Sequence, residues 1–138
     1  MARIDPAVKP VPEVTPALAP FFAAARERRL LVQRCGGCGV LRFPPRELCS
    51  GCLATEATWV EVSGRGEVYS FNVMHQVYHP GFAADVPYAV VVIELAEGVR
   101  LVSNLVGCPV GDVTIGMPVV ATFDEVSDTV ALPKFRPA

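Results

Sequence analysis

The chain has 138 residues, of which 51% are hydrophobic and 19% are charged, and its formal net charge is −2. This composition excludes an intrinsically disordered chain, and the length suits one domain or a small module joined to a larger one. No apolar run reaches the ~18 residues of a membrane span, and the opening stretch, MARIDPAVKPVPEV, lacks the apolar core of a signal peptide, so we expect a cytoplasmic protein that binds no membrane.

The charges are distributed unevenly along the chain. Residues 1–57 carry eight basic and five acidic side chains, whereas residues 58–138 carry four basic and nine acidic ones. A barrel that binds nucleic acid usually carries the opposite sign of charge. We therefore expect no nucleic acid as a partner.

The N-terminal part predicts an arm followed by a helix. Residues 1–18 contain four prolines and little periodicity, which predicts an extended arm that is either a free tail or lies on a partner. The next stretch, APFFAAARERRLLVQ, predicts a helix over about residues 19–29, because Pro20 suits the first helical turn. Phe21 and Phe22 give this helix an apolar face, which either packs inside the chain or docks on a second subunit.

Four of the five cysteines form two CxxC pairs in the stretch CGGCGVLRFPPRELCSGC, with ten residues between the pairs. Two such knuckles can direct four thiolates onto one ion, and cytoplasmic thiols stay reduced, so the spacing predicts one structural zinc ion. Four thiolates fill a tetrahedral shell and leave no position for water or substrate. A rubredoxin-like iron centre is the alternative, which an absorption spectrum would reveal. The predicted ligands are Cys35, Cys38, Cys49 and Cys52.

From residue 58 onward, apolar and polar residues alternate with period two, and glycines lie at the ends of the runs. The predicted strands are EVYSFNVMH, PYAVVVIEL, RLVSNLVG, PVVATFDEV and TVALPKF. Five short strands predict a small closed barrel, with the OB-fold as first candidate. PYAVVVIEL is apolar on both faces, so its outer face needs a cover from the helix, the cysteine module or another chain.

The predicted fold is therefore mainly β. It comprises an extended arm (1–18), a helix with a rubredoxin-like zinc ribbon (19–57) and a five-stranded OB-fold barrel (58–138).

Three segments supply further candidate residues. The loop HQVYHPGFAADVPY, residues 75–88, is typical of a binding loop, and a pair such as His79 and Asp85 could perform general acid–base catalysis. The end of the chain, LPKFRPA, combines two cations with an aromatic ring, which suits a nucleotide. Arg42 and Arg46 in the ribbon are candidate phosphate ligands, and Cys108 is expected to be a small buried residue.

No self-sufficient active site is visible in the sequence. GxGxxG, P-loop, GxSxG and HExxH motifs are all absent.

The order of these parts resembles the zinc-ribbon/OB-fold proteins associated with acyl-CoA metabolism. The resemblance begins near Pro16 and runs through RRLLVQRC, the CxxC pairs, WVEVSGRGEVYSF, RLVSNLVG, IGMPV and LPKFRP. It departs at Leu53, where the family commonly has a knuckle glycine.

The resemblance implies a non-catalytic accessory subunit that binds and stabilises a thiolase-like acyl-CoA enzyme. That enzyme would be a thiolase, a retro-aldol lyase such as those of steroid side-chain degradation, or a complex with a hydratase on a separate chain, and the subunit can help bind the acyl-CoA. A nucleic-acid-binding module and an independent enzyme that uses the loop histidines are the alternatives. Candidates for the acyl-CoA or partner surface are Phe21, Phe22, Arg42, Arg46, Tyr78, His79, Phe82, Tyr88, Lys134, Phe135 and Arg136.

Overall fold

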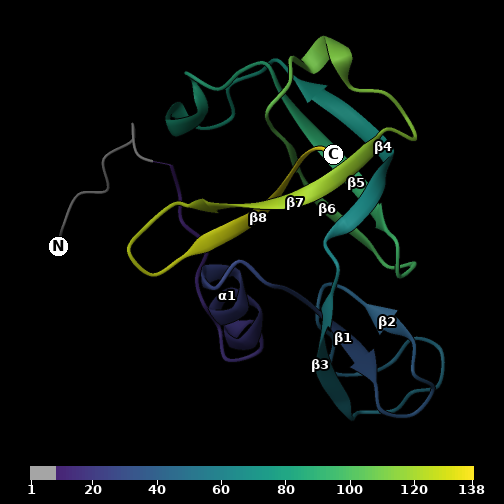
Figure 1. Cartoon of the computed structure of the whole chain (residues 1–138). Helices are drawn as coiled ribbons and strands as arrows, with labels where there is room; N and C mark the ends of the chain where they lie inside the picture. Colours follow the sequence, from purple (N-terminus) through teal and green to yellow (C-terminus); the bar gives the residue numbers. More distant parts are fainter. Residues whose placement is uncertain (1–8) are drawn as a thin grey trace, which may run out of the picture.

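A computed structural model describes residues 9–138 (Figure 1). It contains one α-helix, a three-stranded sheet that carries the cysteines and a closed five-stranded barrel, which confirms the predicted mainly β class. The first eight residues of the predicted arm lie outside the described part. None of the helices within residues 9–138 has the length and apolar character that crossing a bilayer requires.

Helix α1 spans Ala19–Arg26 and ends three residues earlier than predicted. The chain turns at Arg28, whose φ is 61°. The N–H of Arg28 donates to the carbonyl of Ala25, and the N–H of Arg29 donates to the carbonyl of Ala24. These two hydrogen bonds form a Schellman motif, which ends the helix and starts the next strand.

The ribbon sheet has the order β2-β1-β3. Strand β1 (Leu30–Cys35) pairs along its whole length with β3 (Ala57–Val62), but with β2 (Leu41–Arg42) through only two residue pairs. The predicted boundary between residues 57 and 58 falls inside β3, so the chain enters the barrel only after this strand. The first cysteine knuckle therefore lies at the tip of the hairpin that joins β1 and β2.

The barrel contains the five predicted strands, in the closed order β4-β5-β6-β8-β7. Neighbouring strands are antiparallel except β6 and β8, which are parallel and meet at Leu105 and Phe135. Short 3-10 helices at Pro80–Phe82 and Val110–Asp112 lie in two of the connections. The strands are β4 (Arg65–Met74), β5 (Tyr88–Leu95), β6 (Arg100–Leu105), β7 (Pro118–Glu125) and β8 (Ala131–Pro137).

One hydrophobic core joins the helix, the ribbon and the barrel. Helix α1 packs on β1 of the ribbon and on β7 and β8 of the barrel (Figure 1). The centroid of the Phe21 ring lies 4.7 Å from that of Phe43 and 5.3 Å from that of Phe22. Phe21 and Phe22 are only 8% and 6% exposed. Their prediction as a partner surface is wrong, because this aromatic cluster fastens the helix to the ribbon.

Candidate metal centre and binding cavity

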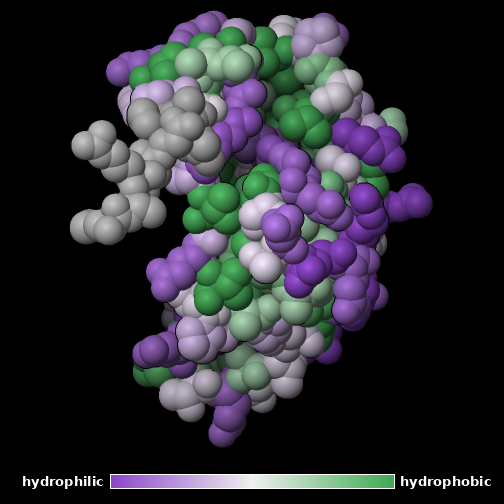
Figure 2. Space-filling view, turned by 90° about the vertical axis from the view of Figure 1, so that its left-hand side faces the viewer, coloured by the Kyte–Doolittle hydropathy of each residue, from purple (hydrophilic) through white to green (hydrophobic). Residues whose placement is uncertain are grey.

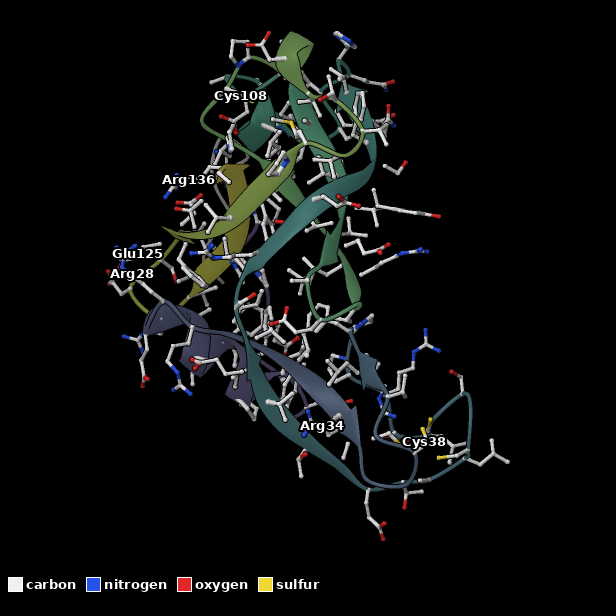
Figure 3. The ribbon with its side chains drawn as sticks, turned by 45° about the vertical axis from the view of Figure 1, so that its right-hand side comes forward. Arg28, Arg34, Cys38, Cys108, Glu125 and Arg136 are labelled. Carbon is white, nitrogen blue, oxygen red and sulfur yellow. The ribbon has the colours of Figure 1, made fainter. Side chains whose placement is uncertain are left out.

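The four cysteines of the two knuckles converge at the tip of the ribbon. Their ligand atoms all lie within 4.8 Å of one another. The Sγ atoms of Cys35 and Cys52 are 3.5 Å apart, and those of Cys38 and Cys49 are 3.7 Å apart. Figure 3 shows Cys38 beside the other sulfur atoms at the far end of the ribbon. The cysteines are therefore positioned to bind one metal ion, as predicted.

Backbone amides prepare two of these sulfur atoms, those of Cys35 and Cys49, for a metal. The N–H groups of Cys38 and Gly37 donate to Cys35 Sγ over 3.5 and 3.3 Å, and they lower the pKa of Cys35 to about 6. Donors from Cys52 and Gly51 lower the pKa of Cys49 in the same way. Thiolate is the form that metal ions bind. A Cβ at Gly37 would lie 2.8 Å from Cβ of Ala54 and 2.9 Å from Cys52 Sγ, so this position of the knuckle has no room for a side chain.

The donor set fits zinc, and it fits a structural site. Four thiolates satisfy the tetrahedral preference of Zn²⁺ and leave no position for a substrate. When bound, the ion would cross-link the two knuckles, which have too little apolar material to hold each other in place.

The second knuckle adopts a left-handed turn without glycine. Gly39 has a φ of 76° in the first knuckle, and Leu53 takes the equivalent place after Cys52 with a φ of 65°. The Leu53 side chain is 67% exposed, so little packing compensates for this conformation. The departure from the family pattern therefore leaves the turn intact and adds strain.

Replacing Leu53 by glycine should relieve this strain. A non-glycine residue in this region costs on the order of 1–3 kcal/mol, and the greater chain entropy of glycine offsets part of the gain. We expect Leu53→Gly to raise the free energy of unfolding by about 1 kcal/mol in guanidinium titrations of the zinc-loaded protein. Gly39→Ala is the matched opposite change, because nothing lies within 4 Å of the added Cβ, and it should lower stability. A less stable Leu53→Gly protein would instead assign Leu53 a packing role.

Arg42 is part of the ribbon's internal structure. Its Nε donates to Oε1 of Gln33 over 3.0 Å, its Nη2 donates to the carbonyl of Arg46 over 2.9 Å, and its Nη1 is buried. The predicted use of Arg42 on a binding surface is wrong, because its guanidinium joins β2 to the loop that follows. The side chain of Arg46 is exposed.

A cavity of about 810 Å³ lies between the arm, the loop joining β4 and β5, and the ends of β6, β7 and β8. It brings together three predicted surface residues, Phe82, Tyr88 and Lys134. The rings of Phe82 and Tyr88 lie 5.9 Å apart, and Nζ of Lys134 donates to Asp124 over 2.6 Å. Figure 2 looks onto the side of the molecule that carries the arm, where hydrophobic residues lie beside hydrophilic ones.

The other predicted loop residues have separate surroundings. His79 accepts a hydrogen bond from the N–H of Gly81 at Nδ1, over 3.0 Å, and Asp85 pairs with Lys9. Among residues 9–138 no hydrogen bond joins His79 to Asp85, and acid–base catalysis by these two residues stays a prediction. Tyr78 is 68% exposed and does not line the cavity.

The C-terminal trio is divided by the alternation of strand β8. Phe135 is completely buried in the core, whereas Arg136 is exposed and Lys134 lines the cavity. The prediction of Phe135 as a binding residue is wrong, because an inward-facing residue of a closed barrel cannot reach a ligand on the surface. Cys108 is only partly buried, less than expected, and lies in the connection between β6 and β7, far from Cys38 (Figure 3).

Sequence reasoning missed Lys9, Asn104 and Asp124 in the wall of the cavity. Nζ of Lys9 lies 2.5 Å from Asp85 and 5.6 Å from the centroid of the Phe82 ring. These residues come from three distant segments, and no local pattern in the sequence pairs them.

Comparison with known proteins identifies both modules. Residues 22–57 match the model of the ChsH2 rubredoxin-like zinc ribbon domain, and residues 59–124 match that of the ChsH2 C-terminal OB-fold domain. In a solved structure titled Ltp2-ChsH2(DUF35) aldolase, one chain superposes with a TM-score of 0.81 and 44% identity. The match covers 92% of this chain and 98% of that one.

Three relatives are similar over most of this chain. A probable enoyl-CoA hydratase alpha subunit of Thermomonospora curvata is 45% identical over 96% of this chain, which spans only 41% of that protein. A DUF35 domain-containing scaffold protein of Methanocaldococcus jannaschii is 40% identical over 75% of this chain and 74% of its own length. The benzoylsuccinyl-CoA thiolase subunit BbsA of Thauera aromatica is 34% identical over 79% of this chain and 77% of its own length.

Proposed function

The chain belongs to the ChsH2 (DUF35) family of zinc-ribbon and OB-fold proteins, and from this we propose that it is a non-catalytic accessory subunit of a thiolase-like acyl-CoA enzyme. Its partner in this proposal is a thiolase or a retro-aldol lyase, acting in the cytoplasm. Steroid side-chain degradation is one pathway that would suit such an enzyme.

The observation that carries the proposal is the match to subunits rather than to complete enzymes. The relatives include a scaffold protein and a thiolase subunit, each covered over about three quarters of its length. The site chemistry agrees with this assignment. The four cysteines fill a tetrahedral shell, and the described residues place neither histidine beside a nucleophile.

We assign the docking surface to the outer face of the barrel, defined by Tyr69, Val90, Val92 and Val102. Val92 and Val102 lie opposite each other on β5 and β6, and Val102 is 67% exposed. Tyr69 is also exposed, and the guanidinium of Arg100 lies 3.7 Å from its ring centroid. Val90 and Val92 are half-buried on the same side of β5. Apolar side chains of this kind beside an aromatic ring and an arginine are typical of protein interfaces. This face includes the outer side of β5, for which the sequence predicted a covering element or chain.

Co-expression tests the accessory role. The thiolase-like protein encoded beside this chain is expressed with and without it, and soluble yield and thiolytic or retro-aldol activity are measured. We expect both to fall when this chain is omitted. Unchanged yield and activity would contradict the accessory role.

A substitution on the outer face tests the docking surface separately. Val102→Asp should weaken capture of the partner by about tenfold or more, because it introduces a charge into an apolar contact. Thr129→Asp adds the same charge at an exposed position in the turn between β7 and β8, two strands that do not neighbour β5, and serves as the control. Equal capture by both variants would exclude the outer face while leaving the accessory role open to the co-expression test.

We further propose that acyl-CoA contacts this chain at the cavity, where Phe82, Tyr88 and Lys134 meet. At this cavity, several of the predicted ligand-binding side chains share one hollow. Arg46, Tyr78, His79 and Arg136 remain candidates for the partner surface.

A further inference from the structure

The arm is part of the wall of the cavity. Lys9, Pro10 and Val11 line one side of it, next to the loop between β4 and β5. The arm forms no strand with the barrel, because residues 9–15 have no regular secondary structure. Side-chain contacts must therefore hold it over the cavity.

Lys9 makes the strongest of these contacts. Its ammonium group lies 2.5 Å from the Asp85 carboxylate and 5.6 Å from the centroid of the Phe82 ring. A carboxylate and an aromatic face together attract a cation. Both charged side chains are partly exposed, at 47% and 38%, so salt weakens this contact and the arm can leave without unfolding the barrel.

The charge of the cavity limits what it can bind. Its carboxylates are Asp85, Asp124 and Glu125, and its only cations are Lys9 and Lys134, each already paired with a carboxylate. A phosphate group would meet a surplus of negative charge. Apart from Asn104, the rest of the wall is aromatic or aliphatic, with Phe82, Tyr88, Leu105, Val106, Val126 and Leu132. The Nδ2 of Asn104 already donates to the carbonyl of Ala89 over 2.9 Å. A neutral, elongated and mainly apolar group fits this lining.

We propose that residues 9–11 are a strap that closes this cavity, with Lys9 as its latch on Asp85 and Phe82, and that the cavity takes a neutral apolar group when the strap opens. If acyl-CoA is the ligand, which rests on the proposed function, its acyl part enters here and its phosphates stay outside. The strap itself is a property of this chain alone and does not depend on the partner.

The test uses the zinc-loaded full chain with the neutral dye Nile red as probe. Lys9→Ala should bind the dye about fivefold more tightly than the unmodified protein, the factor expected for loss of one exposed ion pair and one cation–π contact. Cleavage of the arm between residues 9 and 15 by proteinase K under native conditions should speed up by a similar factor. Asp85→Asn should reproduce both effects.

Two variants serve as controls. Lys9→Arg keeps the positive charge and the cation–π contact, and it should behave like the unmodified protein. Glu13→Gln changes an exposed charge on the same arm that makes no ion pair among the described residues, and it should change neither readout.

Either readout can overturn the proposal. An unchanged rate of arm cleavage in Lys9→Ala would mean that Lys9 does not latch the strap. Equal or weaker dye binding in that variant, or no dye binding by any variant, would mean that the strap does not close a binding cavity. None of these results bears on partner capture, so they can be separated from a failure of the accessory role.

Discussion

Cys49→Ser is expected to remove the metal ion and unfold the tip of the ribbon. Cys49 is buried, and its Sγ lies 3.7 Å from that of Cys38, so the serine variant leaves three cysteines for the ion. Metal binding contributes on the order of 10 kcal/mol or more in small zinc modules, because the ion replaces a hydrophobic core. Zinc content by mass spectrometry should fall from one ion per chain toward zero. Hydrogen exchange between residues 35 and 57 should approach the rate of an unfolded chain.

Cys108→Ser is the matched control, because Cys108 is the one cysteine outside the cluster. It should retain the metal and the protection of the ribbon. Treating the unmodified protein with a strong chelator should reproduce the effect of Cys49→Ser. A folded, metal-free Cys49→Ser ribbon would refute a structural role for the metal. An iron-like absorption spectrum of the purified protein would change the identity of the metal and leave its structural role in place.

Phe135→Ala is expected to be the most destabilising change in the barrel. Phe135 is fully buried, and it pairs with Leu105 of β6 and Ala121 of β7. Its carbonyl accepts a hydrogen bond from the N–H of Val106 over 2.7 Å, at the junction that closes the barrel. Truncating a buried phenylalanine costs about 3–5 kcal/mol, because it leaves a cavity. Urea or guanidinium unfolding at low temperature would measure the loss of unfolding free energy.

Arg136→Ala provides the comparison at the next position of the same strand. Its side chain is exposed, so we expect a change in unfolding free energy within about 0.5 kcal/mol. If acyl-CoA binding were reduced by Phe135→Ala at full stability, our assignment of Phe135 to the core alone would be incorrect.

Local patterns predicted the elements of this fold well. Alternation with period two found all five barrel strands, and the CxxC spacing found the metal site, because both features depend on neighbouring residues. The same alternation could have assigned Phe135 to the core of the barrel. Strand β8 extends to Pro137, so Lys134 and Phe135 must point to opposite faces, but the sequence KFR resembles a binding motif when the strand is taken to end early.

Contacts between distant segments could not be predicted in this way. Whether Phe21 faces a partner or Phe43 depends on how the helix sits on the ribbon, and helical periodicity does not determine that. The cavity likewise depends on Lys9, Asp85 and Asp124, which only barrel closure brings near one another. The sequence suggested that Arg42 was free to bind phosphate, because it does not reveal the acceptors of this side chain. Those acceptors, Gln33 and the carbonyl of Arg46, come together only in the folded ribbon.

The passage from β3 into β4 has a consequence for how the molecule meets other proteins. Only Ser63 and Gly64 separate the two strands. Ser63 donates to the Glu97 carboxylate from its N–H over 2.7 Å, and the carbonyl of Gly64 accepts from the N–H of Ala121 over 2.8 Å. Because no flexible linker separates the two strands, the metal-binding tip and the outer face of the barrel are held at a fixed distance from each other. A protein that contacts both gains avidity only if its own sites match that spacing, so the junction selects partners by length as well as by chemistry.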